Sequence, residues 1–234
     1  MLRGVGLRPG WRVLDAGSGS GSFLPLIAEA VGPAGTIVGR RVTEWGLATP
    51  IEARVGSVLA LPYADDPFDA VWCAATTQYL TDDDLTAALA EFRRVVRPGG
   101  LVALKDYDAT VPRFLPAPAN CLIHYYEVVA RDGVTQYQGV LRTPALGCWL
   151  RRAGLADVRA RTTLVERVAP LAPPGRQLWD DLLAYFAPVA LRHALPAEER
   201  ALWGRLADPA GRARLFDDPD FSCCEGHVVA VGTA

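Results

Sequence analysis

Short apolar runs alternate with amphipathic stretches along the first half of the chain. An apolar run at 12–16 leads through a Gly/Ser-rich turn into a stretch at 20–31, where apolar residues recur at helical spacing. Further strands are predicted at 36–39, 51–55, 68–73 and 101–106, and a helix at 81–96. Alternating strands and helices predict an α/β fold with a parallel sheet and helices on both faces.

The second half gives a weaker pattern. A proline-containing loop is predicted at 108–118, helices at 120–131 and 143–153, and a sixth strand at 158–168. Residues 176–214 read as helical, with breaks near Pro188, Pro196 and Pro209, and a seventh strand is predicted at 226–232. Cys223, Cys224 and Glu225 precede that strand and are interpreted as structural.

Length and composition fit one globular domain over 1–234. The formal net charge is −2 and Lys105 is the only lysine, so no basic surface indicates a nucleic-acid partner. No apolar run is long enough to span a membrane. Five cysteines without metal-type spacing predict buried free thiols, no metal site and a cytoplasmic protein.

The most specific stretch is the turn after the first strand. Asp15 is followed by glycines at alternate positions, Gly17, Gly19 and Gly21. Glycine is needed where the backbone takes a positive φ or lies against a ligand. The following helix offers unpaired N–H groups to an anionic group. The dinucleotide-binding pattern would need its third glycine at position 22, which is Ser22, so a nicotinamide or nucleotide-sugar enzyme is the weaker alternative.

Three motifs in order carry a family resemblance. The glycine loop is followed by Leu61-Pro62-Tyr63 with Phe68-Asp69 five residues later, and then by 97–100, Arg-Pro-Gly-Gly, before an apolar strand. Over residues 11–106 the chain resembles the class I S-adenosylmethionine-dependent methyltransferases, small-molecule enzymes of the UbiE type. The resemblance implies a Rossmann-like, seven-stranded, mostly parallel sheet with a helical cap inserted after strand five. It also implies a helical cap before strand one.

The resemblance assigns a cofactor-binding half to 1–106 and substrate-capping segments to 107–157 and 175–220. The cofactor is then S-adenosylmethionine, with S-adenosylhomocysteine as product, and the acid at the start of the glycine loop holds its amino end. The cofactor-binding residues that follow are Asp15, Ala16, Gly17, Ser18, Gly19, Gly21, Arg40, Ser57, Val58, Leu59, Ala74, Ala75 and Gln78.

The chain departs from the family pattern after the second strand. Arg40 and Arg41 stand where an acid would hold the ribose, and Ser57 replaces the usual aspartate at the adenine. The segment from Arg40 to Ile51 is short for a crossover between parallel strands, which favours a missing piece over a genuine loop deletion with Glu44 or backbone holding the ribose.

Catalytic candidates come from the carboxyl ends of the strands and from the cap. Asp106 and Tyr107 end the fifth strand, and His124 is the one histidine of the predicted cap helix, on a polar stripe typical of a solvated face. Tyr79, Tyr107, His124 and Tyr125 are the predicted substrate contacts, although core packing is the more common use of Tyr125. Asp82–Asp84 are interpreted as helix-capping residues after Thr81.

The sequence thus favours methyl transfer to a small organic metabolite whose accepting atom (oxygen, nitrogen or carbon) stays open. The alternative is a methyltransferase-like fold that binds the cofactor poorly or not at all and serves as a binding module or non-methylating catalyst. The expected partner is a small-molecule acceptor, with no nucleic acid and no membrane. A homo-oligomer stays open, because the sequence starts almost at strand one and a partner subunit would be one source of the helical cap expected before it.

Overall fold

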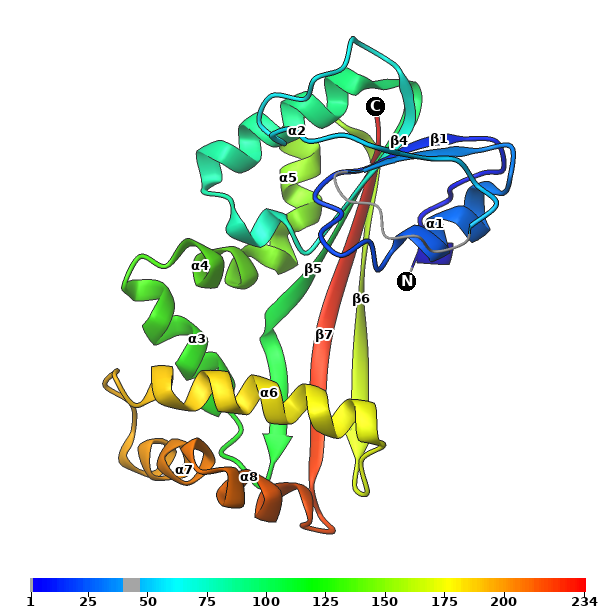
Figure 1. Cartoon of the computed structure of the whole chain (residues 1–234). Helices are drawn as coiled ribbons and strands as arrows, with labels where there is room; N and C mark the ends of the chain where they lie inside the picture. The colour runs from blue at the N-terminus through cyan, green and yellow to red at the C-terminus, as the bar shows by residue number, and fades with distance from the viewer. Residues whose placement is uncertain (1, 40–46) are drawn as a thin grey trace. The chain divides into compact units, whose positions relative to one another are not determined.

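The computed structural model describes residues 2–39 and 47–234 (Figure 1). Its elements in the first half are η1 (Leu2–Gly4), β1 (Arg12–Asp15), α1 (Leu24–Val31), β2 (Thr36–Gly39), β3 (Ile51–Ala53), β4 (Phe68–Ala74), η2 (Thr77–Tyr79), α2 (Asp82–Val95) and β5 (Val96–Leu115). They continue with α3 (Cys121–Arg131), α4 (Thr135–Arg142), η3 (Thr143–Ala145), α5 (Leu146–Arg152), β6 (Ala156–Val168), α6 (Pro173–Ala190), α7 (Ala197–Ala207), α8 (Pro209–Phe216) and β7 (Ser222–Thr233).

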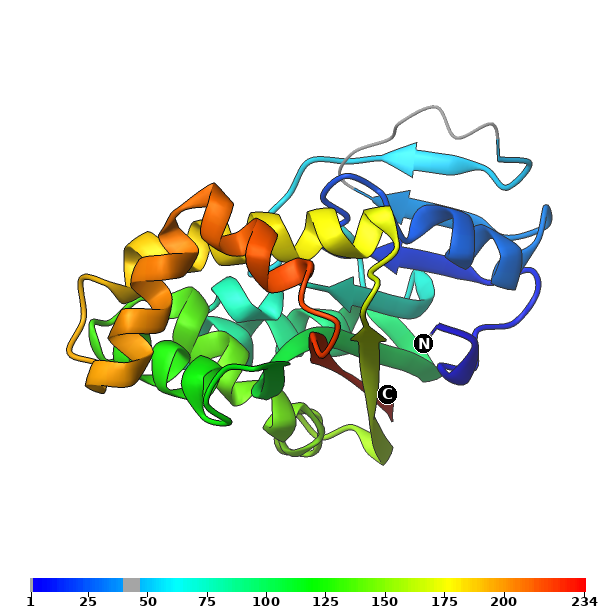
Figure 2. The same cartoon turned by 90° about the horizontal axis from the view of Figure 1, so that it is seen from below.

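Within the described residues, seven strands form one sheet in the order β3-β2-β1-β4-β5-β7-β6. The pairs β1·β2, β1·β4, β2·β3 and β4·β5 are parallel, and the first of these can be followed in Figure 2. At the ends of β7 the hydrogen bonds are those of an antiparallel strand, with Gly99 N–H donating to Ala234 O and Ala169 N–H to Phe221 O. The predicted mostly parallel, seven-stranded sheet is confirmed.

The chain divides into two compact units, and β5, β6 and β7 each have residues in both. The first unit comprises Met1–Tyr107, Arg142–Thr163 and His227–Ala234, and the second comprises Asp108–Leu141 and Leu164–Gly226. The first unit therefore contains the whole predicted cofactor half. The extent of the substrate-capping segments stays a prediction.

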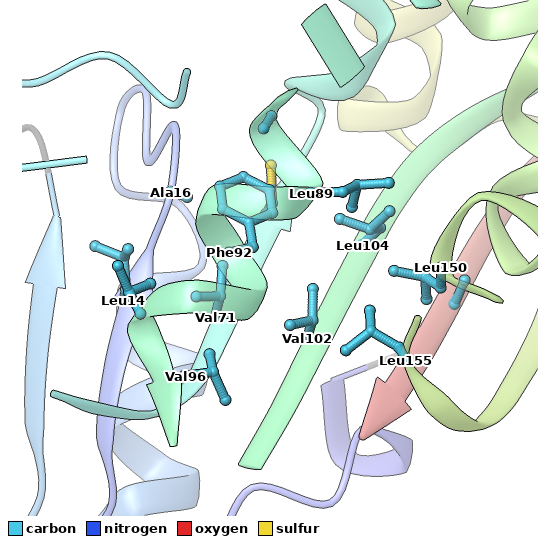
Figure 3. Close-up of a cluster of buried hydrophobic side chains, with 14 of the residues drawn as sticks. Leu14, Ala16, Val71, Leu89, Phe92, Val96, Val102, Leu104, Leu150 and Leu155 are labelled. Carbon is cyan, nitrogen blue, oxygen red and sulfur yellow. The ribbon is translucent and has the colours of Figure 1, made fainter. Parts of the chain in front are cut away.

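The core of the first unit lies on both faces of its strands, because successive strand residues point to opposite faces. On one face Leu14, Val71 and Val102 meet α2 through Leu89 and Phe92, as Figure 3 shows. The opposite face is formed by the alternate strand residues, and η1 and α1 pack on it. Those buried residues include Val13, Ile37, Ala70, Trp72, Leu24 and Ile27. Helices on both faces of the sheet are thus confirmed.

The core of the second unit is aromatic. Tyr125 is fully buried and its ring contacts Tyr126, Tyr137, Phe186 and Trp203 at centroid distances of 4.7–5.7 Å. Its hydroxyl is 2.6 Å from that of Tyr137, so the buried phenols satisfy each other. The packing use of Tyr125 is the one that these contacts show.

Several predicted boundaries were wrong. The first helix begins at Leu24 rather than at position 20, because Gly21 and Ser22 still belong to the turn. The fifth strand continues through the predicted loop to Leu115, and the last strand begins at Ser222, so Cys223, Cys224 and Glu225 lie inside it.

Two further expectations were wrong, and one was right. Helix α6 continues through Pro188 to Ala190, and Cys148 is exposed whereas the other four cysteines are buried. At the start of α2, Thr81 accepts a hydrogen bond from Asp84 N–H at 3.1 Å, which confirms the capping interpretation. Among the helices that the structure describes, none has the length and apolar character to cross a membrane.

Candidate cofactor site

A pocket of about 210 Å³ opens at the carboxyl ends of β1 and β2 in the first unit. From β1 the chain passes to β2 and β3 on one side, and β4 lies on the other side. Ligands of open α/β sheets bind at this reversal of strand order. The pocket is lined by Leu14, Asp15, Ala16, Gly17, Gly39, Arg54, Gly56, Val58, Leu61, Pro62, Tyr63 and Thr76.

The glycine loop has the backbone that the sequence predicted. Gly17, Gly19 and Gly21 have φ values of 79°, 54° and 79°, in the left-handed region that favours glycine. A Cβ on Gly17 would lie 2.2 Å from Thr76 Oγ1, so the loop approaches the end of β4 too closely for a side chain. Ser18 lies against Gly39 at the end of β2, where an added Cβ would be 3.1 Å from Ser18 Oγ.

Asp15 is the acidic residue that lines this pocket. Its side chain is 2% exposed, and its Oδ2 atom has no hydrogen-bond partner among the described residues. Burial raises the pKa of the Asp15 carboxyl to about 7. An unpaired buried carboxylate is costly unless a cation or donor from a ligand satisfies it. A ligand with an ammonium group fits this position.

The wall opposite the glycine loop comes from the segment after β3. Val58, Leu61 and Pro62 give it an apolar surface, and Tyr63 is held edge-on against Phe68 at 4.9 Å. The guanidinium of Arg54 lies 5.2 Å from the Tyr63 ring centre. Such a wall suits a flat ring system.

Two residues predicted to touch adenine are placed differently from Val58. Ser57 and Leu59 are exposed and do not line the pocket. Instead, the Ser57 hydroxyl accepts the Leu59 N–H at 3.2 Å, which shapes the turn between them. Arg40, predicted at the ribose, lies outside the described residues, as do Arg41 and Glu44.

The loop after β4 forms the side of the pocket nearest to the middle of the sheet. Ala75 has φ 51°, and its N–H donates to Lys105 O at 2.8 Å, which ties the loop to the middle of β5. Thr76 faces the pocket and donates to Ala74 O at 3.0 Å. Gln78 is 9% exposed and its side-chain amide donates to Ala75 O, so Gln78 stabilises the loop and does not line the pocket.

Asp106 lies beside this loop in the middle of β5, one residue after Lys105, which pairs with the last residue of β4; the prediction that it ends the strand was wrong. It is fully buried; its Oδ2 accepts a hydrogen bond from the Thr77 hydroxyl, and its Oδ1 has no partner among the described residues. Burial raises its pKa to about 6, against the opposing effects of Thr77, Lys105 and Arg142. Asp106 thus keeps a carboxylate oxygen free for a polar group and is poised to exchange a proton near neutral pH.

Arg142, which the sequence did not bring to attention, holds the same loop in place. Its guanidinium donates to Thr77 O at 2.9 Å and to Leu80 O at 3.0 Å, and it pairs with Asp82 at the start of α2. It also lies 5.5 Å from the Trp149 ring centre, and only 11% of its side chain is exposed. One cation therefore fixes both ends of η2.

The remaining predicted residues are distributed over both units. In the first unit, Tyr79 is 56% exposed and Tyr107 packs edge-on against His227 at 5.9 Å. In the second unit, His124 Nδ1 lies 2.7 Å from Glu199 Oε1, and Glu199 is 3% exposed. The polar stripe of α3 therefore has a buried carboxylate beside it rather than solvent alone.

The structure brings Asp15, Ala16, Gly17 and Val58 together around one pocket. The pocket also contains residues that have no individual signal in the sequence, namely Gly39, Arg54, Gly56 and Thr76. Leu61, Pro62 and Tyr63, which belong to the second motif of the family resemblance, line it as well. Within the part of the chain that the structure describes, no cluster of three His, Cys, Asp or Glu side chains is arranged to hold a metal ion.

Comparison with known proteins agrees with this geometry. A family model described as a methyltransferase domain matches residues 13–100, which include the glycine loop, the apolar wall and the loop after β4. Over this segment the chain is similar to methyltransferases, which supports the resemblance to the class I S-adenosylmethionine-dependent family.

Two curated proteins are similar to part of this chain. A ubiquinone/menaquinone biosynthesis C-methyltransferase, UbiE, from Cupriavidus necator is 36% identical over 116 residues, covering 44% of this chain and 46% of that protein. A protein in transposon Tn4556 of Streptomyces fradiae is 37% identical over 150 residues, covering 57% and 42%. The matches thus span about half the length of these curated relatives.

A solved structure shares the fold over nearly the whole chain. A candidate methyltransferase from Bacillus halodurans superimposes with a TM-score of 0.59 at 16% identity, covering 99% of this chain and 96% of that one. At that identity the likeness shows the fold alone.

Proposed function

We propose that this chain binds S-adenosylmethionine in the pocket at β1 and β2 and transfers its methyl group to a small organic molecule. The observation that carries the proposal is the buried, unpaired Asp15 carboxylate beside three glycines with positive φ. A carboxylate at that position fits the ammonium of the methionine half. The apolar wall with Tyr63 fits the adenine ring.

The residues of the site fit this cofactor in order around the pocket. Asp15 and the backbone of Gly17 and Gly19 would hold the methionine half, and Val58 and Pro62 the adenine. The cofactor supplies, when bound, a methyl group activated on a sulfonium. The chain's part is to hold the acceptor and exclude water, because most of the acceleration of such a displacement comes from orientation in a dry site.

Asp106 is our candidate for the group that accepts a proton from the acceptor. Its Oδ1 is unpaired, and its neighbour Thr77 fixes the other oxygen. A base with a pKa of about 6 is predominantly ionised at neutral pH and so is ready to take a proton. The predicted roles of Tyr107, His124 and Tyr125 in acceptor binding, and the cytoplasmic location, stay predictions.

An acceptor screen tests the proposal. Wild-type protein is incubated with S-adenosylmethionine and a panel of phenols, amines and carbon acceptors, and release of S-adenosylhomocysteine is measured. The panel includes quinol precursors, because the Cupriavidus necator relative is named a C-methyltransferase of ubiquinone and menaquinone biosynthesis. We expect acceptor-dependent release, reduced at least about tenfold in Asp15→Asn by loss of a charge-assisted contact.

Asp83→Asn is the matched control. Asp83 is exposed at the start of α2 and does not line the pocket, so this variant should behave as wild type. Binding of the cofactor without transfer to any acceptor class would favour a binding module with this fold. Equal turnover in wild type and Asp15→Asn would remove Asp15 from the site.

A further inference from the structure

A second pocket of about 380 Å³ lies in the first unit and shares no residue with the cofactor pocket. Its walls come from η1, β6 and β7, three elements that the proposed methyl transfer does not use. Its volume falls within the range of about 300–1,000 Å³ that is typical of small-molecule sites.

The alternation of the strands builds this pocket. Arg159, Arg161 and Thr163 are spaced by two along β6, so their side chains share one face of the strand. Val229 and Val231 have the same spacing on β7 and belong to the core cluster under η1 and α1. The pocket therefore combines an apolar floor with a row of basic and hydroxyl groups.

Three guanidinium groups line the pocket, and no acidic side chain of the described residues lines it with them. Arg3 pairs with Glu29 in an exposed contact of 2.9 Å, and Arg159 donates to Val5 O. The Arg161 side chain has no hydrogen bond or ion pair with any described residue. In a chain whose formal net charge is −2, this is a local excess of positive charge with unused donors.

The open space in the pocket is accessible from η1. A Cβ added to Gly4 would meet no heavy atom within 4 Å, and Gly4 is not among the glycines with positive φ. Room beside the arginines and above the valines is the space that an organic ligand would need.

We propose that this pocket binds a small organic anion with an apolar body. Its carboxylate or phosphate group pairs with Arg161 and Arg159, which offer forked donors suited to such groups. Its apolar part covers Val229 and Val231. This site is separate from the methyl-transfer site, so either can fail without the other.

The competing explanation is that the arginines protect an edge strand. β6 is the last strand in the sheet order, and charged side chains on edge strands discourage pairing with other chains. That explanation needs no ligand, so it predicts that no organic anion binds.

The test titrates the full chain with octanoate, with 1-octanol and with inorganic phosphate, followed by calorimetry and ligand-observed NMR. We expect octanoate to bind more tightly than either of the other probes, because it alone has both the charge and the apolar body. Phosphate binding as tightly as octanoate would contradict the role of the valine floor. Octanol binding as tightly as octanoate would contradict the role of the arginines. If octanoate does not bind at all, the proposal is wrong and the arginines serve only to protect the edge strand.

Three variants locate the site. Arg161→Ala should weaken octanoate binding at least about tenfold, the effect of losing one charge-assisted interaction. Gly4→Leu adds an apolar side chain in the open space and should abolish binding without strain. Arg214→Ala, which removes an exposed arginine of α8 in the second unit, should leave binding unchanged. Wild-type affinity in both Arg161→Ala and Gly4→Leu would overturn the assignment.

Discussion

Arg142→Met is the most informative single change in the first unit, because it removes the cation that fixes the loop after β4. Methionine retains an apolar side chain of similar length but loses the donors to Thr77 O at 2.9 Å and Leu80 O at 3.0 Å. It also loses the ion pair with Asp82 and the contact with the Trp149 ring.

The size of the effect follows from these contacts. A hydrogen bond from a charged donor is worth about 1.5–3 kcal/mol, and a cation–π contact about 0.5–1 kcal/mol. Asp82 is 71% exposed, so its ion pair adds at most about 1 kcal/mol. The hydrogen bonds to Thr77 O and Leu80 O are only partly buried, and water replaces part of what is lost. We therefore expect the free energy of unfolding to fall by about 2–4 kcal/mol.

Urea denaturation measures this change, and titration with S-adenosylhomocysteine shows whether the loop also serves the pocket. We expect weaker binding in Arg142→Met, since the loop that contains Thr76 closes on Gly17. Arg152→Met is the matched control, because Arg152 also lies 5.5 Å from the Trp149 ring centre but no hydrogen bond to the loop is formed by it. A loss in Arg142→Met no larger than in Arg152→Met would refute the reasoning.

Three further changes test other parts of the account. Burial raises the pKa of Asp15 in the folded protein to about 7 from its ordinary value of 3.8, so the stability that this carboxyl contributes is complete below pH about 4 and is lost as pH rises toward 7. Relative to Asp15→Asn, the wild type should thus lose up to about 4 kcal/mol between pH 4 and 7, measured by urea denaturation; a constant difference would contradict the raised pKa. Gly17→Ala should lower the free energy of unfolding by about 1–3 kcal/mol, because the added Cβ would meet Thr76 Oγ1 at 2.2 Å. Adding Thr76→Ala should restore part of that stability, and thermal melts that show no such recovery would argue against the clash. Phe92→Ala, which truncates a fully buried side chain of α2, should lower the free energy of unfolding by about 3–5 kcal/mol. A calorimetric loss below about 1 kcal/mol would mean that the core collapses around the cavity.

Much of the first unit was predictable because its signals are local. The positive φ of Gly17, Gly19 and Gly21 follows from the spacing of glycines after an apolar run that ends in Asp15. The strand and helix order also follows from periodicity. The pocket at the end of β1 could therefore be placed before its walls were known.

The start of β5, which lies at Val96 and not at the predicted position 101, shows the limit of local signals. Residues 97–100 read as a break, yet Gly99 and Gly100 are paired with Ala234 at the far end of the chain. Pairing with a strand that is distant in sequence overrides the local preference of proline and glycine.

Two polar contacts were invisible for the same reason. Arg142 reaches a loop more than 60 residues away, and Glu199 reaches His124 across 75 residues. Neither residue type at those positions indicates its partner, since arginine and glutamate are common on helix surfaces. Only the tertiary structure brings each of these side chains to its partner.

The most direct test of the central claim is calorimetric titration of the wild type and Asp15→Asn with S-adenosylhomocysteine at pH 6 and pH 8. The account predicts binding in the micromolar range, tighter at pH 8 because Asp15, with a pKa of about 7, must be ionised to pair with the ligand ammonium. Asp15→Asn should bind at least about tenfold more weakly and lose the pH dependence. Folded wild-type protein that gives no binding, or equal affinity in the two proteins, would contradict the assignment of this pocket to the cofactor.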